Sequence, residues 1–369
     1  MADWRIALGL LLAATAAAPG WAEDSAPGEW TAPEVAEFSD WSVACDNVHD
    51  CTALSVSRDY VARLAASDPG DYAQPKLWVK RAAGPDARVR VFLDTTVWGE
   101  AGAGEAPATL HVYTPCDGDC TGRAYRLIPL EPGRFELAPA DVAAFLAESA
   151  KTSHAATRFA GGGMHGIITT AGMTAALRFI DESQQRRGTV TAIYAKGPKP
   201  ARAVSLPKPR PRVTVTRGEE VDAYGTPETE AVLFVTRARD CLDVDLDGPD
   251  PHRARYRLAS GHYLWALGCS AKPNAPRRLW LIEKPGEPPA PFTFPRPEQG
   301  RAALPPVLPD SAFDPESGML TAYAGRLCGW RRRWAWTGTA FEMVDAVEMP
   351  PCYGILLHQW LQTYRAVPD

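Results

Sequence analysis

Beyond its first 22 residues the sequence has no apolar run of transmembrane length, so we expect no membrane-spanning helix in the remainder of the chain. It also has no excess of basic charge, because 39 lysines and arginines stand against 44 aspartates and glutamates, a formal net charge of -5. This balance argues against a general nucleic-acid binder. The content of 46% hydrophobic and 22% charged residues is that of a globular protein and excludes wholesale disorder and a fibrous structure.

Recognised catalytic signatures are missing as well. Neither a Gly-x-Ser-x-Gly elbow nor a His-Glu-x-x-His motif occurs, and the seven histidines are scattered. A triad could assemble in space from Ser260, His262 and an aspartate, but nothing in the sequence selects it. Glycines 161–163 precede a predicted helix, yet they lack the Lys-Ser/Thr of a phosphate-binding loop and favour a flexible connection. The sequence therefore reveals no reaction.

The N-terminus has the pattern of an export signal. Arg5 precedes an apolar run over residues 6–18, and the small residues Gly20 and Ala22 follow it. This predicts a signal peptide over residues 1–22, cleaved after Ala22. The alternative is an N-terminal membrane anchor, but the run is short for a hydrocarbon layer about 30 Å thick. No cysteine stands at the cleavage site to be lipidated, so we expect a periplasmic or secreted protein.

Eight cysteines, all after the predicted signal, are typical of an oxidising compartment. They fall into four pairs of neighbours along the sequence. This predicts local disulfides between Cys45 and Cys51, Cys116 and Cys120, Cys241 and Cys269, and Cys328 and Cys352. A zinc site is the competing interpretation. It is disfavoured because no pair has the Cys-x-x-Cys spacing and no histidines are spaced as zinc ligands.

A chain of 369 residues is long enough for two domains. The first domain is expected over residues 23–197. Amphipathic helices are predicted over residues 141–149 and 171–185, with Gly188 as a stop signal after the second. Strand composition and turn residues predict strands over residues 38–45, 77–81, 88–93, 109–113, 125–128 and 189–195.

Residues 198–211 contain five prolines and predict a semi-extended linker between the domains. The second domain, residues 212–369, is expected to be mostly β, with an irregular Pro-rich connection over residues 285–309. Its strands are predicted over residues 231–237, 255–258, 263–267, 279–283, 334–336 and 341–343.

The linker lies in a basic segment. Between Arg186 and Arg217 there are nine basic residues and no acidic ones. The simpler interpretation is a solvated linker. The functional interpretation is attraction to an anionic surface, such as lipid headgroups or a cell-wall polymer.

A calcium-like pattern occurs at Asp243, Asp245 and Asp247, alternate carboxylates followed by Gly248 as in the first half of an EF-hand loop. The motif then departs from the pattern, because Ala254 stands where the bidentate glutamate belongs. A strand with solvated aspartates is therefore the favoured interpretation. A weak calcium site is the second one, and no other cofactor is predicted.

The segment from residue 328 to residue 352 combines a cysteine pair with a hairpin whose turn contains Gly338. Alternation places Trp330, Arg332, Trp334 and Trp336 on one face of its first strand. Tryptophan and arginine are enriched in binding hot spots, which makes this face a candidate contact surface. The alternative is that the tryptophans form the domain core.

Several segments carry a family resemblance: FSDWSVACDN from Phe38, AALRFIDESQQRRGTVTAIYAKG from Ala175, GHYLWALGCSAKPNAPRRLWLI from Gly261, and the terminal Cys-aromatic-Cys unit. In this order they resemble the bacterial exported family known as domain of unknown function 1176, over nearly all of the mature chain. The first stretch is also similar to the invasion-associated locus B family. A departure is Gly-Trp-Arg-Arg-Arg after Cys328, where small polar residues are expected. The resemblance implies architecture and export, and it supplies no catalytic residues.

Together these features predict a disulfide-stapled α+β protein of two domains, predominantly antiparallel β, with helices mainly in the first domain. The leading functional hypothesis is a non-enzymatic periplasmic protein that binds an envelope component or another exported protein. The alternative is a hydrolase acting on a cell-envelope polymer, with a site built from loops.

Overall fold

The computed structural model describes residues 35–56, 75–95, 107–113, 122–152, 154–159, 164–223, 253–269, 277–297, 302–325, 328–350 and 357–369, with residues 232, 241 and 355. The predicted signal peptide, the pair Cys116 and Cys120, glycines 161–163, Cys352 and the aspartates 243, 245 and 247 lie outside these residues.

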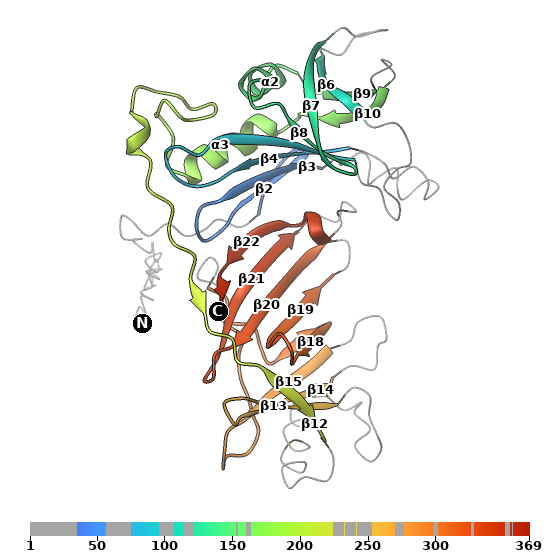
Figure 1. The fold of residues 1–369 in the computed structure, drawn as a ribbon, viewed down its shortest axis with the longest axis vertical. Helices are drawn as coiled ribbons and strands as arrows, with labels where there is room; N and C mark the ends of the chain where they lie inside the picture. Colours follow the sequence, from blue (N-terminus) through green and yellow to red (C-terminus); the bar gives the residue numbers. More distant parts are fainter. Residues whose placement is uncertain are drawn as a thin grey trace, which may run out of the picture. The chain divides into compact units, whose positions relative to one another are not determined.

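The N-terminal part of the chain forms a ten-stranded sheet in the order β1-β2-β3-β4-β5-β8-β7-β6-β9-β10, with every neighbouring pair antiparallel (Figure 1). In chain order its strands are β1 (Ala36–Phe38), β2 (Trp41–Cys45), β3 (Cys51–Ser55), β4 (Lys76–Arg81), β5 (Val89–Asp94), β6 (Pro107–Tyr113), β7 (Arg123–Glu131), β8 (Arg134–Leu137), β9 (His154–Phe159) and β10 (Met164–Thr169).

Two short helices pack on this sheet. Helix α2 (Val142–Ser149) contacts β5 and β6, and helix α3 (Met173–Ser183) contacts β1, β2 and β3. Each helix buries one apolar stripe at helical spacing, as the sequence predicted, and Asp141 is the N-cap residue of α2. The helix ends therefore differ from the predicted ones by only one or two residues at most positions.

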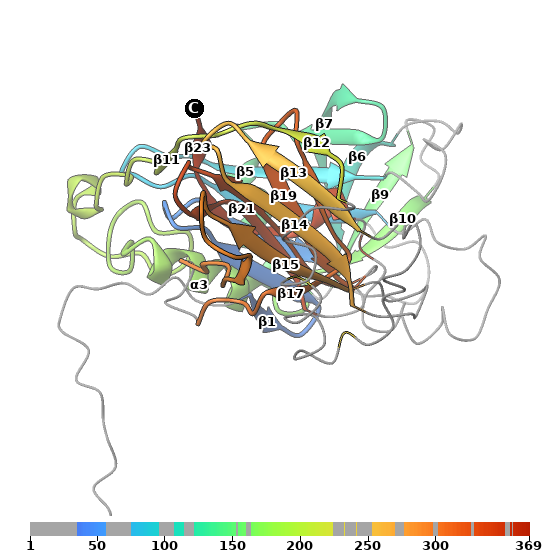
Figure 2. The ribbon, with the colours of Figure 1, turned by 90° about the horizontal axis from the view of Figure 1, so that it is seen from below.

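The C-terminal part of the chain consists of β strands. One sheet has the order β12-β13-β14-β15-β16 with β17 also on β15, and another has the order β18-β19-β20-β21-β22. Figure 2 shows β13, β14 and β15 side by side. The strands are β11 (Arg212–Val213), β12 (Gly218–Val221), β13 (Ala254–Leu258), β14 (Tyr263–Gly268), β15 (Arg277–Glu283), β16 (Ala290–Pro291), β17 (Val307–Pro309), β18 (Ser311–Asp314), β19 (Met319–Ala324), β20 (Gly329–Trp336), β21 (Phe341–Met349), β22 (Leu361–Arg365) and β23 (Val367–Pro368).

The described residues are thus mostly antiparallel β with two short α-helices, and the predicted fold class is confirmed at this level. Residues 198–211 contain only the short 3-10 helix η2 (Ala201–Ala203) and are largely exposed. One apolar cluster draws residues from both sides of this segment, for example Leu54 and Trp78 with Met349 and Leu361. The division into two domains stays a prediction.

The disulfide predictions are confirmed where both cysteines are described. Cys45 bonds Cys51 across the β2–β3 hairpin, and Cys241 bonds Cys269. Cys328 is disulfide-bonded as well, while its predicted partner lies outside the described residues. Covalent cross-links of this kind indicate an oxidising compartment.

Two predicted strands are wrong. Residues 38–45 form a hairpin of β1 and β2 instead of one strand, because Ser39 takes a left-handed φ of 50° and reverses the chain. Residues 189–195 form no strand beyond a single bridge between Thr189 and Lys199. Their apolar and β-branched composition predicted a ladder, but the backbone N–H groups of Ile193, Tyr194 and Ala195 donate to the carboxylate of Asp181 instead.

Candidate ligand-binding site

A cavity of about 770 Å³ lies beside helix α2, in the size range of small-molecule sites. Its walls come from three segments: residues 85–90 at the start of β5, residues 139–151 around α2, and residues 191–201. Strand β8 pairs with β5 only at Phe92, Leu93 and Asp94, so the first half of β5 lacks a strand neighbour on that side among the described residues. The cavity occupies this uncovered part of the sheet.

Helix α2 presents two different faces. Its buried face packs on the sheet through Phe145, whose ring meets that of Tyr125 at 5.5 Å in an edge-to-face arrangement. The Tyr125 hydroxyl also donates a hydrogen bond to the carboxylate of Glu148, and burial raises the pKa of that tyrosine. These contacts fix the helix to β7 and leave its other face toward the cavity.

The cavity face of α2 is apolar and consists of three alanines and one leucine. Ala143, Leu146, Ala147 and Ala150 follow at the i, i+3, i+4 and i+7 positions, and all four line the cavity. Six of the cavity's lining residues are alanines, so the hollow exists because short side chains stand where larger ones would fill it.

The rim of the cavity is charged and mainly basic. Its described lining includes five basic and two acidic residues. The Arg90 guanidinium forms two hydrogen bonds of 2.8 Å to the two carboxylate oxygens of Glu136, which neutralises that acid. Lys151 and Lys196 are exposed and form no ion pair with a described residue. The rim therefore carries a surplus of positive charge.

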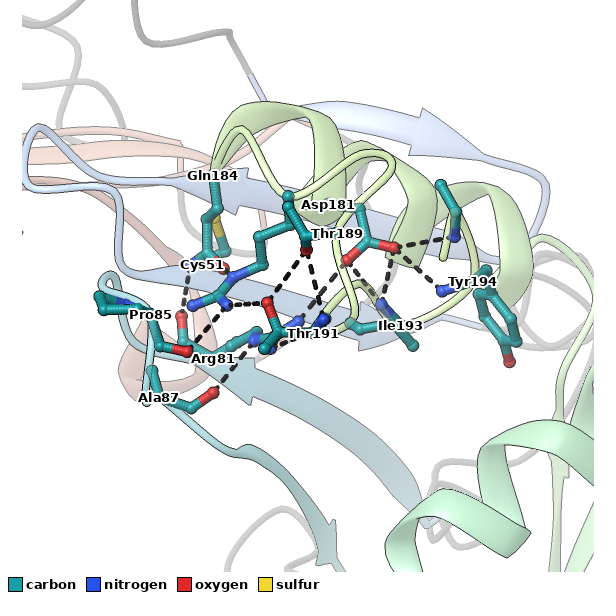
Figure 3. Close-up of polar contacts among 12 residues, drawn as sticks. Cys51, Arg81, Pro85, Ala87, Asp181, Gln184, Thr189, Thr191, Ile193 and Tyr194 are labelled. Atoms are coloured by element: carbon teal, nitrogen blue, oxygen red, sulfur yellow. Dashed lines mark hydrogen bonds and ion pairs between the residues drawn. The ribbon is translucent and has the colours of Figure 1, made fainter. Parts of the chain in front are cut away.

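A buried polar network forms the wall behind the cavity (Figure 3). Asp181 on α3 is fully buried and accepts backbone hydrogen bonds from Ile193 at 2.8 Å, Tyr194 at 3.0 Å and Ala195 at 3.3 Å. A carboxylate with several such donors can remain buried, because each oxygen is satisfied. Asp181 thereby shapes the loop that lines one side of the cavity.

Arg81 is the ion-pair partner of this carboxylate, and Arg186 belongs to the same buried network. The Arg81 Nη1 atom lies 3.5 Å from Asp181 Oδ1, and Arg81 Nη2 donates to the backbone oxygen of Thr191 at 2.7 Å. Arg186 is fully buried and donates from Nη1 to the Thr191 hydroxyl at 3.1 Å and from Nη2 to the backbone oxygen of Gly84. Burial lowers the pKa of Arg81 to about 10, so Arg81 stays protonated at neutral pH. Burial also lowers the pKa of Arg186.

Gln184 and Tyr194 complete the wall. The Gln184 amide donates to the backbone oxygens of His49 at 2.8 Å and Arg81 at 3.0 Å, and its oxygen accepts from Arg186 Nε at 2.9 Å. The Tyr194 hydroxyl donates to the backbone oxygen of Leu146 at 2.6 Å, and burial raises its pKa to about 12. The loop after α3 is therefore tied both to the β2–β3 hairpin and to α2.

The predicted aromatic contact surface lies elsewhere, in the C-terminal part of the chain. Trp334 and Trp336 on β20 are buried, and their indole nitrogens donate to Pro295 O at 2.8 Å and Ser260 Oγ at 2.9 Å. Arg332 is also buried, pairs with Glu348 and stacks on the Trp330 ring, with 4.4 Å from its guanidinium carbon to the ring centroid. These positions favour the core interpretation for all but the half-buried Trp330, and the binding role stays a prediction.

Ser260 and His262 are brought together, as the triad hypothesis required. His262 Nδ1 lies 3.0 Å from Ser260 Oγ in the turn between β13 and β14. Ser260 Oγ also accepts the indole N–H of Trp336, and the His262 ring meets the same indole edge-to-face, with 5.2 Å between the ring centroids. The serine and histidine are therefore also part of the packing of this hairpin.

The remaining candidates gain less from the structure. The three aspartates of the calcium hypothesis are outside the described residues, and within the described ones no cluster of three or more His, Cys, Asp or Glu is placed to hold a metal. In the same ranges, no helix has the length and hydropathy needed to span a bilayer. Of the basic residues around the linker, Arg186 is buried, whereas Lys208 and Arg217 are exposed.

Sequence reasoning identified helix α2 but not the cavity beside it. The signal that existed was the alanine spacing on α2, which is indistinguishable in sequence from an ordinary solvated helix face. Asp181 and Arg81 gave no signal, because 100 residues separate them in the chain and their pairing depends on the sheet.

Comparison with known proteins supplies the family. The model of a protein family described as "Protein of unknown function (DUF1176)" matches residues 35–367. The chain belongs to this family. The match begins after the predicted signal peptide and covers all the described segments up to residue 367, which confirms the resemblance noted in the sequence.

A curated relative has the same coverage. The chain is 28% identical over 347 residues to "Uncharacterized protein YpfG" of Escherichia coli (strain K12), spanning 88% of this chain and 90% of that protein. No solved structure matches the chain significantly. The comparisons thus establish membership of this DUF1176 family and leave its function to be argued from the site.

Proposed function

We propose that this DUF1176 protein is a non-enzymatic binding protein of the bacterial cell envelope, and that it holds a small ligand in the cavity beside α2. The observation that carries the proposal is the cavity itself. A hollow of about 770 Å³ with an apolar helix face on one side and a prearranged polar wall on the other is the usual form of a ligand site.

The polar wall supports binding because it is rigid. Asp181, Arg81 and Arg186 fix the loop over residues 191–195 through contacts within the protein, so little conformational entropy is lost when a ligand enters. Among the described lining residues there is no Ser, Cys or His, the side chains most used as nucleophile or general base. The cavity is therefore better suited to retention than to reaction.

The cellular setting is part of the same proposal. The N-terminal sequence has the pattern of a signal peptide, and the disulfides indicate an oxidising compartment, which together support a periplasmic or secreted protein. An envelope component or another exported protein is the partner class that this setting supplies. The exposed basic residues of the Pro-rich segment, such as Lys208, suit contact with an anionic surface.

The test is to recover what the protein carries. The chain is purified under native conditions from the periplasm, extracted, and the extract is compared by mass spectrometry with that of the Ala147→Trp variant, which fills the cavity from α2. We expect compounds that accompany the wild-type protein and are depleted about tenfold in the variant, because a filled site excludes them. The same compounds in equal amounts from both proteins would contradict the proposal.

A second candidate function rests on the contact between Ser260 and His262. The pairing of a hydroxyl and an imidazole at 3.0 Å is the arrangement that activates a serine nucleophile, and it supports the hydrolase alternative. A serine-directed fluorophosphonate distinguishes the two functions. Covalent labelling of the wild-type protein that is lost in Ser260→Ala would favour the hydrolase, whereas absence of labelling would remove this candidate.

A further inference from the structure

From the chemistry of the cavity we infer that its ligand is an amphipathic anion, with an apolar body against α2 and an anionic head at the basic rim. This inference rests on the proposed function and specifies the class of ligand. It is carried by three features: the alanine face, the surplus of basic groups, and hydroxyl groups that are already engaged.

The apolar body is called for by the cavity face of α2. Ala143, Ala147 and Ala150 are exposed apolar side chains that line the cavity next to the buried Leu146. Removing such an apolar surface from water is favourable, so a ligand with an aliphatic or aromatic body is stabilised here.

The anionic head is called for by the rim. Glu136 is neutralised by Arg90, which leaves the exposed Asp86 against Arg88, Lys151 and Lys196. Lys151 also follows the C-terminal end of α2, where the helix dipole favours a positive charge. The ammonium group of Lys151 is therefore held near the rim, where an anion can bind it.

The wall behind the cavity adds to the attraction. Arg81 lines the cavity, and together with Arg186 it sets two guanidinium groups against the single carboxylate of Asp181. The network therefore retains a net positive charge in a region of low dielectric, where charges act over longer distances than in water. An anion inside the cavity is favoured by this field, and a cation is disfavoured.

Neutral sugars fit this cavity poorly, because its hydroxyl groups are already used. The Thr191 hydroxyl accepts from Arg186 and contacts Thr189 Oγ1 at 3.1 Å. The Tyr194 hydroxyl donates to Leu146 O. A polyhydroxylated ligand would leave hydrogen-bonding groups unpaired against the alanine face, which is unfavourable because these groups lose their hydrogen bonds to water.

Two fluorescent probes test the inference on the full chain. Anilinonaphthalene sulfonate is an amphipathic anion, and N-phenylnaphthylamine has the same rings without the sulfonate. We expect the sulfonate to bind about tenfold more tightly than the uncharged probe, because one hydrogen bond or ion pair with a charged group changes affinity by about that factor. Dodecanoate should displace it, while dodecyltrimethylammonium, of the same chain length and opposite charge, should not.

Variants locate the binding. Replacing both rim lysines, Lys151→Gln with Lys196→Gln, should abolish the tenfold preference for the sulfonate, while Lys199→Gln, an exposed lysine outside the lining, should leave it unchanged. Ala147→Trp should weaken both probes about tenfold by filling the cavity. Ala143→Trp, one turn earlier on α2, should weaken both probes in the same way. Circular dichroism shows whether each variant is folded.

The outcomes separate the ligand class from the proposed function. Equal affinity for the two probes, lowered by Ala147→Trp but not by the lysine changes, would overturn the anionic class and leave the cavity as a binding site. Affinities that neither alanine variant lowers, or no binding of either probe or of dodecanoate, would overturn both.

Discussion

The sheet region under α2 and the tryptophan-rich hairpin of β20 and β21 solve the same packing problem with opposite side chains. Around Trp334, the rings of Phe294 at 5.0 Å and Phe341 behind it fill the interior. Beside α2, exposed alanines line a cavity and do not fill it. A filled interior favours stability, whereas an unfilled one next to fixed polar groups offers a place for a ligand.

Because of this difference, tryptophan and arginine, the residue types most enriched in binding hot spots, do not locate the candidate site in this sequence. Trp334 and Arg332 have the composition of an interaction hot spot, yet both are buried, the first in an aromatic core and the second in an ion pair with Glu348. The helix with the least conspicuous side chains lines the cavity instead. In this protein the large aromatic residues thus lie in a closely packed core, whereas the small residues of a fixed helix line a cavity.

The largest effect is expected in the filled region. Trp334→Ala removes a fully buried indole and its hydrogen bond to Pro295 O, which should lower the free energy of unfolding by about 3 to 5 kcal/mol. Chemical denaturation measures it. The matched control is Trp330→Ala on the same strand, whose half-buried ring should cost clearly less. Equal losses for the two variants would break the contrast between core and surface tryptophans.

A nearly comparable loss is expected behind the cavity. Asp181→Asn keeps the shape of the side chain but removes the charge that compensates Arg81 and Arg186, so unfolding free energy should fall by roughly 3 kcal/mol. Glu182→Gln, the exposed neighbour on α3, serves as control and should change it by less than about 0.5 kcal/mol. A loss below about 1 kcal/mol for Asp181→Asn would show that the network is not the support of the loop.

A smaller, pH-dependent effect is expected at the β2–β3 hairpin, where Asp46 pairs with Arg365 of β22 at 3.0 Å. Burial raises the pKa of Asp46 to about 6. Because the folded state then holds the proton more tightly than the unfolded state, this carboxyl favours folding at low pH, and its contribution is lost as pH rises.

The measurement is the free energy of unfolding as a function of pH for wild type and Asp46→Asn. Between about pH 4 and pH 6 the wild type should lose roughly 2 kcal/mol relative to the variant, with little further change above this range. A wild type that instead loses stability relative to Asp46→Asn as pH falls would contradict the prediction and would indicate an ordinary ion pair with Arg365.

The smallest effect on stability is expected on the cavity face of α2. Ala147→Leu places a larger side chain in existing space, so the free energy of unfolding should change by no more than about 0.5 kcal/mol. The same change at the buried Ala346 of β21, fully enclosed in the aromatic cluster, should destabilise by about 1 to 3 kcal/mol through overpacking. Similar costs at the two positions would show that the α2 face is not hollow.

Much of the fold could be predicted from local patterns. Alternation placed β4 and β5 within one or two residues, and helical spacing placed α2 and α3. The predicted hairpin was also confirmed, with Thr337 N bonded to Ala340 O and Gly338 at a positive φ. These signals are local, and each depends on residues a few positions apart.

The candidate site could not be predicted in the same way. Residues 189–195 have strand composition, but the side-chain carboxylate of Asp181 on α3 binds the backbone of residues 193–195 and prevents a strand ladder. Strand β8 leaves β5 uncovered before Phe92, and only this register opens the space that the α2 alanines line. Both facts depend on tertiary arrangement, so composition and spacing carried no trace of them.

Amide hydrogen exchange with and without anilinonaphthalene sulfonate tests the central claim most directly, because it compares the two regions in one experiment. The account predicts slower exchange in peptides covering α2 and residues 191–196, with no change in peptides covering β20. Protection confined to residues 330–336, with none around α2, would contradict it.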